Sequence, residues 1–231
     1  MISFNSIPLD SVAPVKIEDI RVSPIKYAPV TRPRAIQYGS EFVRMRGGER
    51  TVAVTFALLE QDQITRREYL SSISDWAKTD AEYMIEVSDA PERCLYGVCT
   101  SKPEPSTRVW WENKLRVVFT CYNNPFWTGE EKTVACGTQF CALGDAPPLM
   151  RIERTLSSSA SNQSYSNTSQ TMTFSTIPAG NLVIDLNNQT AKVGSTSIMQ
   201  YYQPSGSFII PKTGVQTITG TGTVKYRERF E

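Results

Sequence analysis

The stretch RTVAVTFALLEQDQITRREYLSSISDWAKT, residues 50–79, predicts a strand that turns into a helix. From Val52 to Leu58 every second residue is a large apolar one, which is the period of a strand with one buried face. Farther along, the apolar positions follow a helical stripe, and Asp62 is placed to cap a helix over 62–79. One strand followed by one amphipathic helix indicates a mostly β domain with a single helix on its face, or any other small α+β domain.

Alternating apolar residues predict further strands on both sides of this unit. They are Met1–Leu9, Val15–Pro24, Glu82–Val87, Cys94–Thr100 and Trp110–Tyr122. The pair Gly47-Gly48 predicts a tight turn that folds Glu41–Leu59 into a β-hairpin. The segment Lys102–Thr107 is rich in proline and is expected to form a hinge.

The segment Ser23–Tyr38 carries three prolines, which remove donors from a strand ladder, so we expect an exposed loop or a sheet edge. Parity places Arg44, Arg46 and Arg50 on one side of the expected hairpin. Such a row is either a solvated polar face or a salt-bridged contact with a neighbouring subunit. If it is a contact, the candidate residues are Arg32, Arg34, Arg44 and Arg46.

The composition changes about two thirds of the way along the chain. Residues 1–136 hold 18 acidic and 17 basic residues, whereas 137–231 hold 5 and 7. The second part has short strand candidates separated by turns at Asn187-Asn188, Pro204-Ser205-Gly206 and Lys212-Thr213-Gly214, which is typical of a β-sandwich. The expected strands are Leu149–Leu156, Thr171–Phe174, Asn181–Asp185, Ala191–Val193, Phe208–Ile210, Gln216–Thr219 and Thr223–Arg229. We therefore expect two domains, 1–133 and 134–231, with the boundary in Glu130–Gly137 and with 223–231 either closing the sandwich or returning to the first domain.

The overall composition argues against several classes of protein. A net charge of +1 gives no reason to expect a nucleic-acid-binding or acidic-membrane-binding surface. No window is long and apolar enough to span a bilayer, and the first residues do not read as an export signal, so synthesis in the cytoplasm is expected. The five cysteines are expected to be free thiols, because their count is odd and no export signal is seen. Their spacing does not suit a zinc site.

Little in the chain points to catalysis. Histidine, the commonest general base and metal ligand, is absent. Gly220-Thr221-Gly222 is not followed by a helix and so does not predict a phosphate-binding loop. Asp89, Glu92 and Glu104 are expected in turns, without the apolar surroundings that would separate their acidities. We expect neither an enzyme nor a cofactor, and a hydrolase has no motif to support it.

The order of these parts resembles the distal tail proteins of long-tailed, non-contractile bacteriophages and their prophages. The resemblance lies in the unit from Gly47 to its helix, in Lys114–Cys121 running to Asn124-Pro125-Phe126-Trp127, in Leu182–Leu186 with Ala191–Val193, and in the ending Tyr226–Phe230. It implies a mainly β protein with a ring-forming N-terminal domain and a C-terminal galectin-like β-sandwich.

The resemblance also implies a structural role at the phage tail tip. Copies of the chain, six by family pattern, would form a ring that joins the tail tube protein to the tip protein and to a receptor-binding protein, and DNA would pass through without specific binding. The alternative is a module that binds cell-wall sugars, because galectin-like sandwiches suggest sugar. The candidate contacts for that role are Tyr201 and Tyr202, the only adjacent aromatic residues of the sandwich.

Overall fold

The computed structural model describes residues 1–33, 40–60, 62–105 and 114–231, and for 28–33, 40–47 and 102–105 it describes the backbone only. The chain divides into two compact units, Met1–Trp127 and Thr128–Glu231. The composition had suggested a boundary within Glu130–Gly137, most of which lies in strand β10.

The first unit is an antiparallel β structure with two helices. One sheet has the order β3-β6-β9-β8 and a second has the order β8-β7-β1-β2. The strands are β1 Ile2–Phe4, β2 Ile7–Pro8, β3 Val15–Val22, β4 Tyr27–Pro33, β5 Ser40–Gly47, β6 Arg50–Leu58, β7 Tyr83–Val87, β8 Arg93–Pro105 and β9 Lys114–Cys121, and the helices are α1 Leu9–Val12 and α2 Gln63–Ala77.

Strand β8 belongs to both sheets of this unit. Its first residues pair with β7, and from Val98 onward it pairs with β9. At Gly97 a β-carbon would lie 2.9 Å from the carbonyl oxygen of Thr120, so only glycine lets β9 approach this closely where β8 passes from one sheet to the other. The expected hinge at Lys102–Thr107 was wrong as far as Pro105, because β8 runs through it; 106 and 107 lie outside the described residues.

Helix α2 forms where the apolar stripe predicted it. Asp62 accepts a hydrogen bond from the backbone N–H of Thr65 at 2.9 Å, as an N-cap should. Ile73 and Ala77 are buried in a core with β1, β6, β7, β8 and β9. An aromatic cluster ties the helix to this core, since Phe119 of β9 lies 4.7 Å from Phe4 and 5.8 Å from Trp76, measured between ring centroids.

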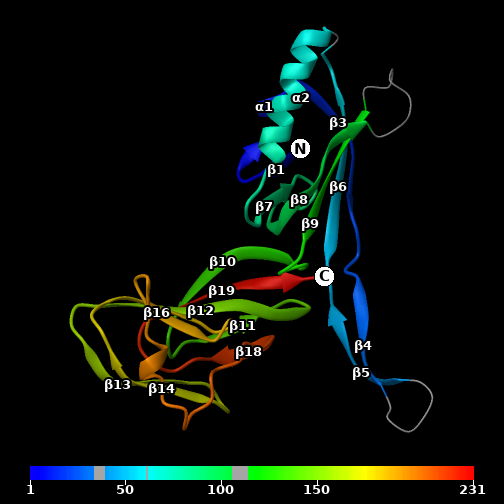
Figure 1. Ribbon diagram of the computed structural model, residues 1–231. Coiled ribbons are helices and arrows are strands. Elements are labelled where there is room, and N and C mark those ends of the chain that lie inside the picture. Colours follow the sequence, from blue (N-terminus) through cyan, green and yellow to red (C-terminus); the bar gives the residue numbers. More distant parts are fainter. Residues whose placement is uncertain (34–39, 61, 106–113) are drawn as a thin grey trace. The chain divides into compact units, whose positions relative to one another are not determined.

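The expected hairpin Glu41–Leu59 was wrong. Strand β5 pairs with β4, and the chain then runs on through Gly48 into β6, which pairs with β3 and β9 (Figure 1). Gly48 donates from its backbone N–H to the carbonyl oxygen of Lys26, and a β-carbon at this position would come within 2.6 Å of that oxygen. This glycine therefore permits two strands to lie close together and does not reverse the chain. Strands β4 and β5 form a ribbon, here called the arm, that continues the β3–β6 ladder.

The second unit is a β-sandwich of two layers (Figure 1). The larger layer has the order β17-β16-β15-β12-β19-β10. The smaller layer consists of the ribbons β13–β14 and β11–β18, joined by a bridge between Ser166 and Thr219. The elements are β10 Trp127–Ala135, β11 Gln139–Ala142, β12 Ala146–Leu156, β13 Ala160–Ser166, β14 Thr171–Ile177, β15 Gly180–Asp185, β16 Thr190–Val193, β17 Thr196–Ser197, the 3₁₀ helix η1 Met199–Tyr201, β18 Gly214–Thr217 and β19 Thr223–Phe230.

Apolar side chains from both layers fill one core between them, including Ile152, Phe174 and Ile184. The strand expected at Phe208–Ile210 was wrong. Phe208 and Ile209 are buried in this core from an irregular segment, so the apolar run reflects burial and not pairing. Strand β19 pairs with β12 and closes the sandwich.

Candidate functional site

The most concentrated charge on the second unit is an ion-pair network across β10, β12 and β19. Arg151 and Lys225 lie opposite each other in the register of β12 and β19, where like charges would repel. Two glutamates relieve this repulsion. Glu153 binds Arg151 at 2.6 Å and Lys225 at 2.8 Å, and Glu131 of β10 binds Arg151 at 2.8 Å. Arg227 joins the network at 3.7 Å from Glu131.

This network has a structural role, because its charged groups bind one another. Hydrogen bonds from Lys225 and Arg151 hold the pKa of Glu153 below its ordinary value, so the carboxylate stays charged and bound at neutral pH. Each charge is a quarter to two fifths exposed. The alternation of Arg151 and Glu153 on one strand and of Lys225 and Arg227 on another was the sequence signal that could have revealed it.

A second polar group lies where the chain crosses between the sandwich layers. Glu228 is only 6% exposed, and its carboxylate accepts hydrogen bonds from the Lys132 ammonium and from the backbone N–H of Leu143, both at 2.9 Å. The bond to Glu228 raises the pKa of Lys132. Because the carboxylate satisfies the first free N–H after β11, it fixes the end of that strand.

The carboxylates considered for catalysis are dispersed. Asp89 and Glu92 lie in the β7–β8 turn as expected and are exposed. Glu104 was expected in a turn, and that was wrong, because its backbone lies in β8 opposite Arg116. Within the described ranges no three acidic, cysteine or histidine side chains gather as a metal site would require, and no helix is long and apolar enough to cross a bilayer.

All five cysteines are free thiols. Cys94 and Cys121 are buried, and Cys141 is exposed. Burial, followed by the nearby charge of Glu82, raises the pKa of Cys121 to about 12, so this thiol is not a nucleophile at neutral pH.

The glycine pair of the Gly220-Thr221-Gly222 motif serves packing. Gly220 has a φ of +140°, and a β-carbon there would lie 2.5 Å from a ring carbon of Tyr165, which is buried. A β-carbon at Gly222 would lie 2.5 Å from the carbonyl oxygen of Glu153. Both positions require glycine because the chain passes over β12 and β13 without room for a side chain.

Three of the four candidate arginines belong to the arm. The backbones of Arg32, Arg44 and Arg46 lie in β4 and β5, with Arg32 opposite Glu41 and Arg46 opposite Ala28 in the register. Arg34 lies outside the described residues. Arg50, expected on the same side, is buried at the start of β6.

The two tyrosines proposed to contact sugar are half-buried against the sandwich core. The Tyr202 hydroxyl donates to the carbonyl oxygen of Gly206 at 3.0 Å, and its ring lies 5.8 Å from that of Phe174 and 5.7 Å from that of Phe208. The neighbouring asparagines are engaged as well, since Asn187 accepts from the backbone N–H of Met150 and donates to Pro148. Sugar contact therefore stays a prediction.

Neither a protein-family model nor a curated protein sequence matches the chain. Among solved structures the chain is similar to SPP1 Dit (gp 19.1), whose crystal structure is described as a paradigm of the hub adsorption apparatus in phages that infect Gram-positive bacteria. The two share 17% identity with a TM-score of 0.76, and the match covers 100% of this chain and 98% of that one. A chain of the phage P2 baseplate in its activated conformation with Ca matches at 7% identity and a TM-score of 0.47, over 93% of this chain and 90% of that one, which is too remote to carry an argument. The first likeness establishes the fold.

Proposed function

We propose that this protein is a structural hub component of a long, non-contractile phage tail. The observation that carries the proposal is the match to SPP1 Dit over essentially the whole of both chains, including both units. A structural match along both whole chains is more specific evidence of function than a shared β-sandwich, because the β-sandwich fold occurs in proteins of many functions. Localisation to the virion tail tip, after synthesis in the host cytoplasm, follows from this assignment.

The hub acts as a closed ring of copies, six by family pattern. Rings form when one patch of each copy binds a different patch of the next. The arm suits such a contact, because β4 and β5 pair only with each other among the described strands and each keeps one edge open. Unpaired strand edges readily add a further strand.

The proposed ring joins the tail tube protein on one side to the tip and receptor-binding proteins on the other. DNA moves through its opening. A net charge of +1 supports this role, since a strongly basic channel would hold DNA through its phosphates. We further propose that the C-terminal sandwich has the galectin-like fold that the resemblance to distal tail proteins implies. No arrangement of side chains on it favours sugar binding as the main function.

The ring is tested by charge reversal in the arm. Light scattering of purified protein is expected to give a ring-sized particle, and negative-stain microscopy to show a central opening. Arg44→Glu with Arg46→Glu is expected to leave a monomer. The matched control is Arg66→Glu with Arg67→Glu, an adjacent pair at the start of α2 that is outside the arm. If the arm variant still forms the ring, these arginines are not part of the contact.

A further inference from the structure

The arm and one other part of the first unit carry opposite charge. Strands β4 and β5 contain three arginines and one glutamate, whereas residues 80–92 contain five acidic residues and no lysine or arginine. The nearest basic residues outside the second stretch are Lys78 and Arg93. The chain as a whole has a net charge of only +1, yet the first unit contains one basic element and one acidic element.

The acidic stretch spans β7 and the turn that follows it. Glu86 faces solvent from β7 and accepts a hydrogen bond from Ser3, while Asp89 and Glu92 are exposed in the turn. Within the part of the chain that the structure describes, none of these three carboxylates forms an ion pair. Their negative charge is therefore available to a partner. We call Glu86, Asp89 and Glu92 the acidic turn.

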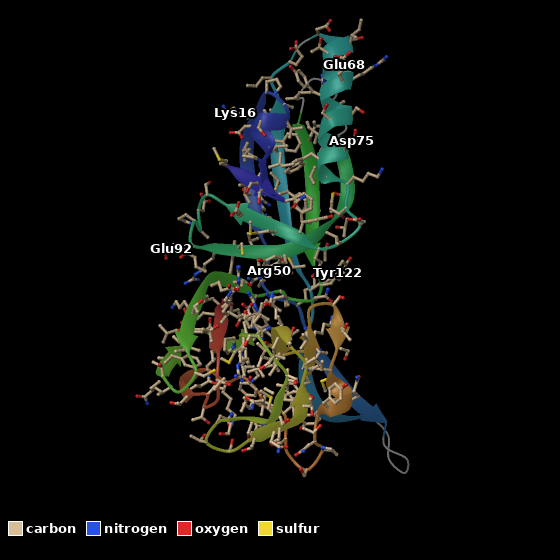
Figure 2. All side chains as sticks on the ribbon, turned by 90° about the vertical axis from the view of Figure 1, so that its left-hand side faces the viewer. Lys16, Arg50, Glu68, Asp75, Glu92 and Tyr122 are labelled. Atoms are coloured by element: carbon tan, nitrogen blue, oxygen red, sulfur yellow. The ribbon has the colours of Figure 1, made fainter. Side chains whose placement is uncertain are left out.

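The two elements are separate within one copy. The arm continues from β6 past Arg50, whereas the acidic turn closes the β7–β8 hairpin. Figure 2 shows Glu92 well apart from the blue ribbon of β4 and β5. Because the two elements lie apart within one copy, their complementary charges can meet when two copies associate.

From this arrangement we propose that the arm of one copy docks on the acidic turn of the next copy, which rests on the proposed ring. The contact is heterologous: it uses a different patch on each side and repeats around an axis, as ring closure requires. Opposite charge brings the two patches together and fixes their register, while the open strand edges of the arm supply directional hydrogen bonds. The interface is expected to be sensitive to salt, because the carboxylates of the acidic turn are exposed.

The test uses two double variants, each of which is expected not to assemble alone but to assemble when mixed with the other. The arm variant is Arg44→Glu with Arg46→Glu, and the turn variant is Asp89→Lys with Glu92→Lys. In each, like charges face each other, and we expect association to weaken by about a hundredfold or more. Mixed in equal amounts, each reversed patch meets the reversed patch of the other variant, and ring-sized particles are expected to return in light scattering and sedimentation.

A matched control keeps this test specific. Glu68→Lys with Asp75→Lys reverses two exposed carboxylates on α2, shown in Figure 2 away from Glu92, and is expected to assemble normally and not to rescue the arm variant. If the arm variant is monomeric but the turn variant assembles as the native chain does, the arm docks elsewhere; the present inference then fails and the proposed ring stands. If the arm variant itself assembles into the ring, the present inference fails and the proposed ring stands. If the native chain stays monomeric at low salt and high concentration, both fail.

Discussion

Replacing Phe119 with alanine tests the two-unit description most directly. The side chain is fully buried, and its ring lies 4.7 Å from Phe4 and 5.8 Å from Trp76. Burying a phenylalanine is worth about 1.5–3 kcal/mol, and each aromatic pair adds roughly 0.5–1.5 kcal/mol. Because Phe4 and Trp76 are held by β1 and α2, the cavity closes poorly, and we expect a loss of about 4 kcal/mol.

The loss should be confined to the first unit. At this size, about 4 kcal/mol corresponds to a fall in Tm of roughly 15 °C. Native-state hydrogen exchange followed by mass spectrometry is expected to show lower protection of the amides of β6 and β9 and unchanged protection of those of β12 and β15. Phe119→Leu, which keeps most of the volume, is the control and should cost about 1 kcal/mol.

Two results would refute this reasoning. Equal loss of protection in β9 and β12 would mean that the chain unfolds as one unit, contrary to the division at Trp127. A loss below about 1 kcal/mol would mean that the aromatic cluster is not the packing centre described, because truncation of a well-packed phenylalanine costs more than that.

Three further predictions concern the sandwich and the thiols. Because the pKa of Glu153 is lowered on folding, its stabilisation is present above the unfolded carboxyl pKa of about 4.3 and is lost as pH falls toward the folded value, so Glu153→Gln should destabilise at pH 7 and much less at pH 3 in urea melts. Gly220→Ala should cost more than about 2 kcal/mol by thermal denaturation, whereas Gly137→Ala, with a φ of +87° and nothing within 4 Å, should cost only about 1 kcal/mol; equal losses would contradict the contact with Tyr165. Cys141 should react with a thiol reagent at pH 8 within minutes and Cys121 only on unfolding, and early labelling of Cys121 would show that β9 is not buried as described.

Sequence patterns predicted the elements that bury one clear face. The alternation from Leu115 to Cys121 matches four buried side chains on β9. Helix α2 spans Gln63–Ala77, close to the expected 62–79, because its stripe and its N-cap agree. The mainly β fold with one main helix was therefore predictable from local periodicity.

The errors have separate physical causes. Gly47-Gly48 predicts a turn because glycine is common in turns, whereas in the structure Gly48 permits a close contact with Lys26, which is distant in the sequence. Strand β13 is mostly serine, asparagine and glutamine with one buried tyrosine, so it lacks a hydrophobic period. Glu130, Glu131 and Lys132 of strand β10 hide its pairing in the sequence, because charged residues interrupt the apolar pattern of a strand.

Only some of the candidate contact residues could be identified from the sequence. Arginines 32, 34, 44 and 46 stand out as a basic group in the linear chain. In the sequence, Asp89 and Glu92 stand out only as candidate catalytic carboxylates. Their proposed role as a counterpart of the arm depends on placing β7, β8 and the arm in one unit, which the sequence alone does not do.

The continuity of β5 with β6 has a mechanical consequence. A pull on the arm along its length reaches β6 directly, and β6 is bonded on one side to β3 and on the other to β9. Tension in this direction loads many hydrogen bonds at the same moment, in shear, whereas a sideways tug would open them one after another. This connection therefore resists axial traction far better than peeling, which is the property that the proposed hub of a tail would need under load.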